Sequence, residues 1–139
     1  MTAQEKLLYT AKVRTSGGRE KGVSRSSDGR LDIRLSTPGT PGTGTNPEQL
    51  FAAGWSACFE GAMAIAARTR KVALPDDLSI DAEIDLNVAD GAYFLRARLD
   101  VRLPGLDRAV AQALVDAAHE TCPYSKATRG NVEVVITLA

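Results

Sequence analysis

Two cysteines, Cys58 and Cys122, are the side chains of this sequence best suited to redox chemistry. A cysteine thiolate attacks the O–O bond of a peroxide and is left as a sulfenic acid. A second thiol nearby condenses with that sulfenic acid to a disulfide, which limits oxidation to the sulfinic acid. The pair would suffice to reduce a peroxide if the fold brings the two Cα atoms within about 7 Å. Each cysteine alone is also consistent with a small buried apolar residue.

A reactive Cys58 would need a positive charge beside it. The pKa of a free thiol is about 8.5, and burial raises it, so a neutral surrounding would leave the thiol protonated. Arginine suits this task because it is always charged and holds a carboxylate through two parallel hydrogen bonds. The early part of the chain carries Arg14, Arg19, Arg25 and Arg30, and spacing alone does not choose among them.

The segment around Cys58 predicts a long helix. A favoured N-cap at Asn46 is followed by a proline and then by residues 50–67, which are almost all apolar or small. A helix that is apolar nearly all round is expected to be buried. Gly54 and Gly61 flank Cys58 by about one turn each, and each costs roughly 1 kcal/mol relative to alanine. They indicate close approach of another element, or room for a ligand.

Alternation of apolar and polar residues predicts strands on both sides of this helix. Asp28-Gly29 and Asp90-Gly91 are hairpin turns, and Pro123 ends a second helix because it disfavours helical geometry at Cys122. Strands separated by two helices indicate a single α+β domain over residues 1–139. The predicted elements are strands over residues 7–15, 22–27, 30–36, 78–88 and 95–103, a helix over 107–122 and a last strand over 132–138.

Composition narrows the class of protein. The net charge is zero and aromatic residues are few, so there is no basic footprint for nucleic acid. No apolar run approaches the roughly 18–20 residues of a membrane span, and the polar start resembles no signal peptide, so we expect a cytoplasmic protein. His119 stands three residues before Cys122, but one histidine and two cysteines are too few for a conventional zinc site. We therefore expect no metal cofactor.

Two long segments carry a resemblance to a known family. Residues 46–59, Asn-Pro-Glu-Gln-Leu-Phe-Ala-Ala-Gly-Trp-Ser-Ala-Cys-Phe, and residues 122–131, Cys-Pro-Tyr-Ser-Lys-Ala-Thr-Arg-Gly-Asn, resemble the signature stretches of the organic hydroperoxide resistance (Ohr) proteins. These are the thiol peroxidase branch of the Ohr/OsmC family. The resemblance covers nearly the whole chain, with Trp55 standing where the family often has tyrosine. It implies an OsmC-like fold in an intertwined homodimer without a prosthetic group.

The resemblance also implies an activity and roles for individual residues. The enzyme would reduce lipid or alkyl hydroperoxides to alcohols, with Cys58 as nucleophile and Cys122 as its disulfide partner. Arg19, in a Gly-Gly-Arg turn, would activate the thiolate, and Glu48 would orient Arg19. Dihydrolipoamide or a lipoylated protein would reduce the disulfide. The candidates for an apolar substrate pocket, which are equally consistent with plain core residues, are Phe51, Trp55, Phe59 and Tyr124.

Two other interpretations stay open at this point. The first is an OsmC-type peroxidase with another reductant or substrate range, which turnover of hydrogen peroxide against a bulky alkyl hydroperoxide would distinguish. The second is a redox sensor or ligand binder without catalysis, in which the same disulfide acts as a switch. Such a protein would oxidise once and show no sustained turnover with any dithiol.

Overall fold

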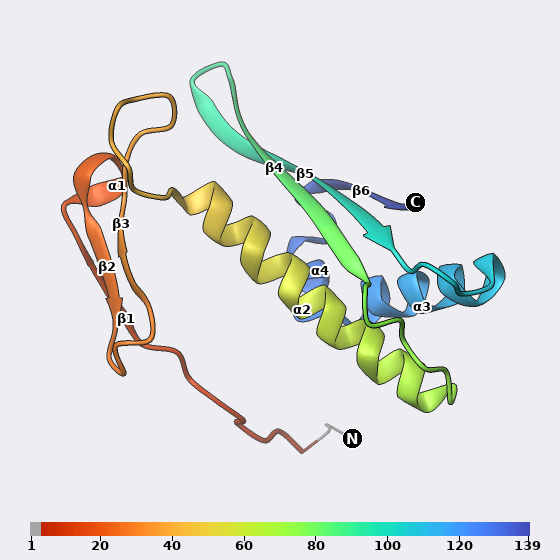
Figure 1. Ribbon diagram of the computed structural model, residues 1–139. Helices are drawn as coiled ribbons and strands as arrows, with labels where there is room; N and C mark the ends of the chain where they lie inside the picture. The colour runs from red at the N-terminus through yellow and green to blue at the C-terminus, as the bar shows by residue number, and fades with distance from the viewer. Residues whose placement is uncertain (1–3) are drawn as a thin grey trace. The chain divides into compact units, whose positions relative to one another are not determined.

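The structure is a computed structural model that describes residues 4–139, so the first three residues of the polar start lie outside the described part. The chain forms two compact units, one ending at Pro47 and one spanning Glu48–Ala139 (Figure 1). They are called unit 1 and unit 2 below, and each is described by itself. The prediction of a single domain over the whole chain stays a prediction.

Unit 1 is a small antiparallel sheet. Its strands β1 (Val13–Ser16), β2 (Val23–Ser26) and β3 (Asp32–Arg34) lie in that order, and the helix α1 (Gly18–Lys21) connects the first two. The predicted hairpin around Asp28-Gly29 is confirmed. The strand predicted over residues 7–15 is wrong in its first two thirds, since residues 7–12 lie outside β1 and pairing with β2 begins only at Val13.

Unit 2 contains the long helix α2 (Pro47–Thr69) except for its first residue, and this helix confirms the predicted one and its start. By length and composition alone α2 could cross a membrane, although only about a third of its most apolar window is buried inside this chain. The expectation that no segment would reach that length is therefore wrong by this measure. The reason is that alanines and glycines between the larger side chains keep the whole helix apolar. A core helix of a soluble protein passes the same test.

A three-stranded sheet covers α2. Strands β4 (Ser79–Ala89) and β5 (Ala92–Arg102) form the predicted hairpin, and Asp90 and Gly91 at its tip have φ of 51° and 77°. Positive φ at both positions is the requirement of the two-residue turn that matches the twist of a hairpin. Strand β6 (Glu133–Leu138) lies on the other side of β5 and runs parallel to it.

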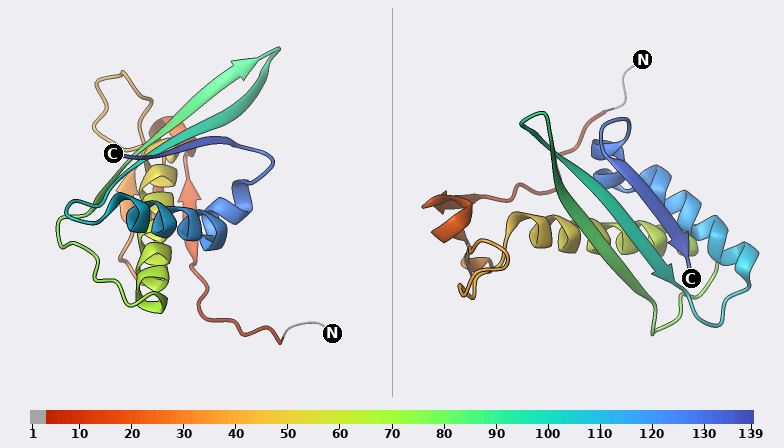
Figure 2. Two further views of the ribbon diagram at one scale, coloured as in Figure 1. Left: turned by 90° about the vertical axis from the view of Figure 1, so that its right-hand side faces the viewer. Right: turned by 90° about the horizontal axis from the view of Figure 1, so that it is seen from above.

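Two helices connect β5 to β6. Helix α3 (Arg108–Thr121) starts at the predicted cap, where the Asp107 carboxylate accepts the Val110 N–H at 3.3 Å. The short helix α4 (Pro123–Thr128), which sequence reasoning missed, follows directly. One face of the sheet packs on α2 and α3, as Figure 2 shows, and the predicted α+β architecture is confirmed. The buried core residues shared by these elements include Trp55, Phe59, Met63, Leu99, Val101 and Val115.

Candidate functional site

The fold brings the two cysteines together, although 63 positions lie between them in the sequence. Cys58 lies about three turns into α2 and is half-buried, whereas Cys122 is fully buried at the junction of α3 and α4. Both thiols are free, and they lie within hydrogen-bonding reach of each other. The arrangement needed for a reversible disulfide is therefore present within unit 2.

The backbone of Cys122 belongs to two helices at once. Its N–H donates to Ala118 O at 2.8 Å and closes α3, and its carbonyl accepts the Lys126 N–H at 2.9 Å and opens α4. Its φ of −60° and ψ of 125° are the extended geometry that a following proline favours. The predicted end of the second helix at Cys122 is confirmed, and the side chain is left without a capping task.

The pKa of the Cys58 thiol is raised by its surroundings. Burial raises the pKa of the Cys58 thiol, and the neighbouring Cys122 thiol raises this pKa further through a hydrogen bond and charge repulsion. The backbone N–H of Tyr124 donates to Cys58 and lowers the pKa, but this is the smallest of the four contributions. Since the thiolate is the reactive form, a reactive Cys58 requires a positive charge beyond these contacts.

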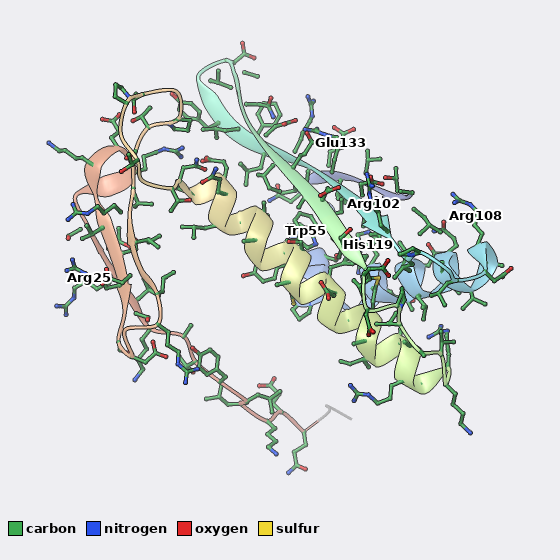
Figure 3. The ribbon with its side chains drawn as sticks, viewed as in Figure 1. Arg25, Trp55, Arg102, Arg108, His119 and Glu133 are labelled. Carbon is green, nitrogen blue, oxygen red and sulfur yellow. The ribbon has the colours of Figure 1, made fainter. Side chains whose placement is uncertain are left out.

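One face of α2 packs against the start of α4. Phe51 makes edge-to-face contacts with Trp55 and Tyr124, with ring centroids 5.7 Å and 6.1 Å away. The Trp55 indole N–H donates to Ser125 Oγ at 3.2 Å, and both of these side chains are fully buried. Figure 3 shows Trp55 on α2 in the interior of unit 2. Gly54 completes the face, because a Cβ at this position would lie only 2.8 Å from Tyr124 Oη.

A cavity of about 690 Å³ opens beside Cys58. One wall is the face of α2 that follows Cys58 at helical spacing, and the other is the C-terminal end of α3 with Pro123. The walls are mostly apolar, with Arg70 and Glu120 as their charged residues. The apolar residues of α2 in this wall are Gly61, Ala62, Ile65 and Ala66.

The four aromatic residues suggested by the sequence are not in this lining. Trp55 and Phe59 are fully buried in the core, Phe51 is half-buried, and Tyr124 is 39% exposed. Gly61 was predicted to leave room for a ligand or to allow close approach, and it lines the cavity. Ala62, Ile65 and Ala66 were missed because small or aliphatic side chains carry no chemical signal of their own. Their spacing from Cys58, at four, seven and eight residues along a helix, was the pattern that would have found them.

The two charged residues expected to act on Cys58 come from different parts of the chain. Arg19 lies in α1 of unit 1, and Glu48 lies in the first turn of α2 at the start of unit 2. Ten residues separate Glu48 from Cys58, which is roughly 15 Å along a helix. Glu48 therefore does not contact the thiol from its own helix, and its role, like that of Arg19, stays a prediction.

His119, the histidine three residues before Cys122, is half-buried in α3. Its Nδ1 is buried and has no hydrogen-bond partner among residues 4–139. Burial lowers the pKa of His119, and the nearby positive charge of Arg129 lowers it further. In the described part of the chain, no three His, Cys, Asp or Glu side chains are grouped so that they could hold a metal ion.

The chain was then compared with known proteins. Residues 39–137 match the family model of OsmC-like proteins. The organic hydroperoxide resistance protein of Xanthomonas axonopodis pv. citri is 50% identical over the full length of both chains. The crystal structure of the organic hydroperoxide resistance protein OhrB of Bacillus subtilis superposes with a TM-score of 0.89 at 46% identity, covering 96% of this chain and all of that one.

A second structure gives the same result. An organic hydroperoxide resistance protein from Legionella pneumophila has a TM-score of 0.89 at 42% identity, over 96% of this chain and 99% of its own. The predicted OsmC-like fold is confirmed by both structures. The chain therefore belongs to the OsmC-like family and, within it, to the organic hydroperoxide resistance proteins.

Proposed function

We propose that this protein is a cytoplasmic thiol peroxidase that reduces organic hydroperoxides to alcohols. The observation that carries the proposal is the pair of free thiols, Cys58 and Cys122, in mutual contact beside an apolar cavity. The names of its relatives, organic hydroperoxide resistance proteins, agree with this chemistry. The cytoplasmic location is part of the proposal because a disulfide that must be reduced again after every turnover suits a reducing compartment.

The reaction divides into two steps between the cysteines. The Cys58 thiolate attacks the terminal peroxide oxygen, so that an S–O bond forms, the O–O bond breaks, and the alkoxide leaves with a proton as the alcohol. The Cys122 thiol then attacks the Cys58 sulfenic acid, and water leaves as the disulfide forms. The hydroperoxide gains two electrons, and the thiol pair loses them.

Arg19 is proposed to supply the positive charge that Cys58 needs. Burial and the neighbouring Cys122 both raise the Cys58 pKa, so only a cation brought to the thiol keeps it ionised near neutral pH. A guanidinium would also stabilise the charge that develops on the peroxide oxygens. Glu48 is proposed to orient this guanidinium, since its distance along α2 excludes direct contact with the thiol from the helix.

The cavity beside Cys58 is proposed to hold the organic part of the substrate. Its volume of about 690 Å³ is within the range of small-molecule sites, and its α2 wall is apolar. Phe51 and Tyr124 are proposed to border the reacting thiol, whereas Trp55 and Phe59, which are fully buried, are proposed to shape the site from behind. An apolar site of this kind favours alkyl and lipid hydroperoxides over hydrogen peroxide.

A homodimer is proposed from the uncovered face of α2. Ala53, Ala57, Gly61 and Ile65 follow one another at four-residue spacing, and all four are exposed in the single chain, Ile65 to 62%. Small residues in a row allow another helix to approach closely, and the same stripe on a second copy would meet it across a twofold axis. The second copy would then close the open side of the cavity. Sedimentation of the purified protein measures the mass directly.

A dithiol of the dihydrolipoyl type is proposed as the reductant, on the resemblance to the family. In the disulfide form the sulfur of Cys58 is the accessible one, because Cys122 is fully buried. An incoming thiolate would therefore attack Cys58, and the second thiol of the same dithiol would release the mixed disulfide. The products are the two reduced cysteines and an oxidised lipoyl ring.

Steady-state consumption of an alkyl hydroperoxide tests the proposal, with dihydrolipoamide as donor and thioredoxin as the control donor. Sustained turnover with dihydrolipoamide that is lost in Cys58→Ser supports it. One equivalent consumed, followed by no turnover with either donor, would instead identify a sensor. Faster turnover of hydrogen peroxide than of a bulky hydroperoxide would indicate the substrate range of an OsmC-type enzyme.

Replacement of the proposed activating arginine gives a sharper test. Arg19→Ala is expected to lower kcat/KM about 100-fold or more, which is the scale on which a preorganised charge stabilises a transition state. Arg30→Ala is the matched control, because its side chain is 91% exposed in the same unit. Near-normal turnover in Arg19→Ala would assign the activation to another residue.

A further inference from the structure

The contact between α2 and α4 contains a buried side-chain hydrogen bond, Trp55–Ser125, that links the two cysteine-bearing segments in addition to the contacts of the thiols themselves. Trp55 lies three residues before Cys58, and Ser125 lies three residues after Cys122. The indole N–H donates to Ser125 Oγ at 3.2 Å, with both side chains at 0% exposure. Each partner is thus about one helical turn from a sulfur, and the bond spans the same gap that the disulfide must close.

We propose that the Trp55–Ser125 hydrogen bond is a positioning device that holds the Cys58 and Cys122 thiols at closing distance. It would thereby set the rate of disulfide formation relative to overoxidation of Cys58. The inference rests on the proposed thiol peroxidase function and adds two positioning residues to it. Neither residue touches the substrate, since both lie fully buried behind the reacting thiols.

The chemistry of the two partners makes this bond hard to replace. The indole N–H is a donor only, and water does not reach it at zero exposure, so it stays satisfied only while Ser125 faces Trp55. Sliding or rotation of α4 along α2 would leave the buried donor unpaired, which is unfavourable in a protein interior. The ring contacts of Phe51 allow a range of offsets, whereas the Trp55–Ser125 hydrogen bond is satisfied in one register of α4 on α2.

The position of the sulfurs matters because the sulfenic acid has two fates. In the first, Cys122 attacks it, the S–S bond forms and water leaves. In the second, a further hydroperoxide oxidises it, so that the Cys58 sulfenic acid becomes a sulfinic acid and the hydroperoxide becomes an alcohol. The first step depends on the distance between two residues of the protein, and the second depends on hydroperoxide concentration. A displaced α4 therefore slows disulfide formation but not oxidation to the sulfinic acid.

Ser125→Ala removes the acceptor, and Trp55→Phe removes the donor while keeping an aromatic ring. Thr128→Val is the matched control: its buried hydroxyl donates to Tyr124 O and Ser125 O inside α4 and does not reach α2. Each reduced protein is mixed with excess alkyl hydroperoxide and quenched with acid at short times. Disulfide and sulfinic acid at Cys58 are then quantified by peptide mass spectrometry over a series of hydroperoxide concentrations.

We expect disulfide closure in Ser125→Ala and Trp55→Phe to slow about tenfold, within the roughly 100-fold that a misplacement of 1 Å can produce. The sulfinic acid formed per turnover should rise by the same factor. Thr128→Val should stay within about twofold of wild type on both measures, according to the local nature of its hydrogen bonds. Each variant is assayed at a temperature at which circular dichroism shows it to be fully folded, so that a simple loss of stability does not change the ratio of the two fates.

Unchanged closure and unchanged sulfinic acid in both Ser125→Ala and Trp55→Phe would overturn the inference and leave the peroxidase function intact. Equal slowing in Thr128→Val would also overturn it, since the integrity of α4 in general, not this bond, would then set the rate. A wild-type protein that consumes no hydroperoxide would overturn the proposed function, and this inference with it.

Discussion

Gly54→Ala tests whether the close packing of Tyr124 on α2 is the reason for a glycine in the middle of this helix. Alanine is favoured over glycine in a helix interior by about 1 kcal/mol, so the substitution would stabilise an isolated α2. In the folded protein the new Cβ would lie 2.8 Å from Tyr124 Oη and 3.2 Å from Tyr124 Cζ, well inside the 3.4 Å at which ordinary contact begins. The tyrosine ring must therefore move.

The two effects have opposite signs and can be weighed. Overpacking of a filled site costs about 1–3 kcal/mol, which exceeds the gain in helix propensity. Tyr124 is 39% exposed and its hydroxyl is the far end of the side chain, so the lower part of that range applies. We expect Gly54→Ala to lower the free energy of unfolding by about 0–1 kcal/mol. In a Tyr124→Phe background the atom at 2.8 Å is gone, and the loss should shrink by about 1 kcal/mol.

Gly54→Ala, Tyr124→Phe, the double variant and the wild type form a double-mutant cycle. Urea unfolding of these four proteins, at one fixed protein concentration, measures their free energies of unfolding. The coupling energy between positions 54 and 124 is the quantity of interest, because it removes the effects that each substitution has alone. A coupling of about 1 kcal/mol would confirm the contact. Equal effects of Gly54→Ala in both backgrounds, or a gain of stability in the wild-type background, would refute the reasoning.

Two further predictions concern protonation. Cys122→Ala should lower the pKa of Cys58, since the hydrogen bond and charge repulsion from Cys122 both raise it while burial remains; ultraviolet titration of the thiolate measures this, and an unchanged or higher pKa would contradict it. The pKa of His119 is lowered in the folded state from an ordinary value near 6.5, so the unfolded chain binds the proton more readily and stability is lost as pH falls below about 6.5. His119→Gln should therefore lose less stability than wild type between about pH 7 and pH 5, and parallel Tm profiles of the two proteins would exclude this role for His119.

Local signals in the sequence predicted much of the fold. The start of α2 at Pro47, the Asp90-Gly91 turn and the cap at Asp107 each depend on a few neighbouring residues, and all three are confirmed. Strand β1 was predicted too long because the alternation of residues 7–15 does not reveal how far a partner strand extends. The parallel pairing of β6 with β5 was equally hidden, since it joins strands that are separated by two helices.

In the candidate site too, some features could be predicted from local sequence and others depend on packing between distant segments. Cysteine and its neighbours carry a chemical signal, so Cys58 and Cys122 were identified, but their contact depends on packing between distant segments. A glycine inside the predicted helix indicated either close approach of another element or room for a ligand, and the two glycines of α2 show one case each. Close approach by another element is confirmed at Gly54, where Tyr124 packs, whereas a Cβ at Gly61 would meet nothing within 4 Å and this residue lines the cavity. Trp55 was assigned to the pocket because an aromatic residue near a nucleophile suggests substrate contact, yet it is fully buried.

The backbone and the side chain of Cys122 have independent roles: the backbone ends one helix and starts the next, and the sulfur carries the redox chemistry. The end of one helix and the start of the next depend on its amide and carbonyl, which every amino acid other than proline provides. The sulfur contributes nothing to either helix end, so mutation could exchange it for another small side chain while the turn survived. A related protein with such a replacement would keep the fold but could not form the disulfide. A protein of this fold therefore reveals whether it retains a thiol partner only through the identity of the side chain at this position, not through its backbone.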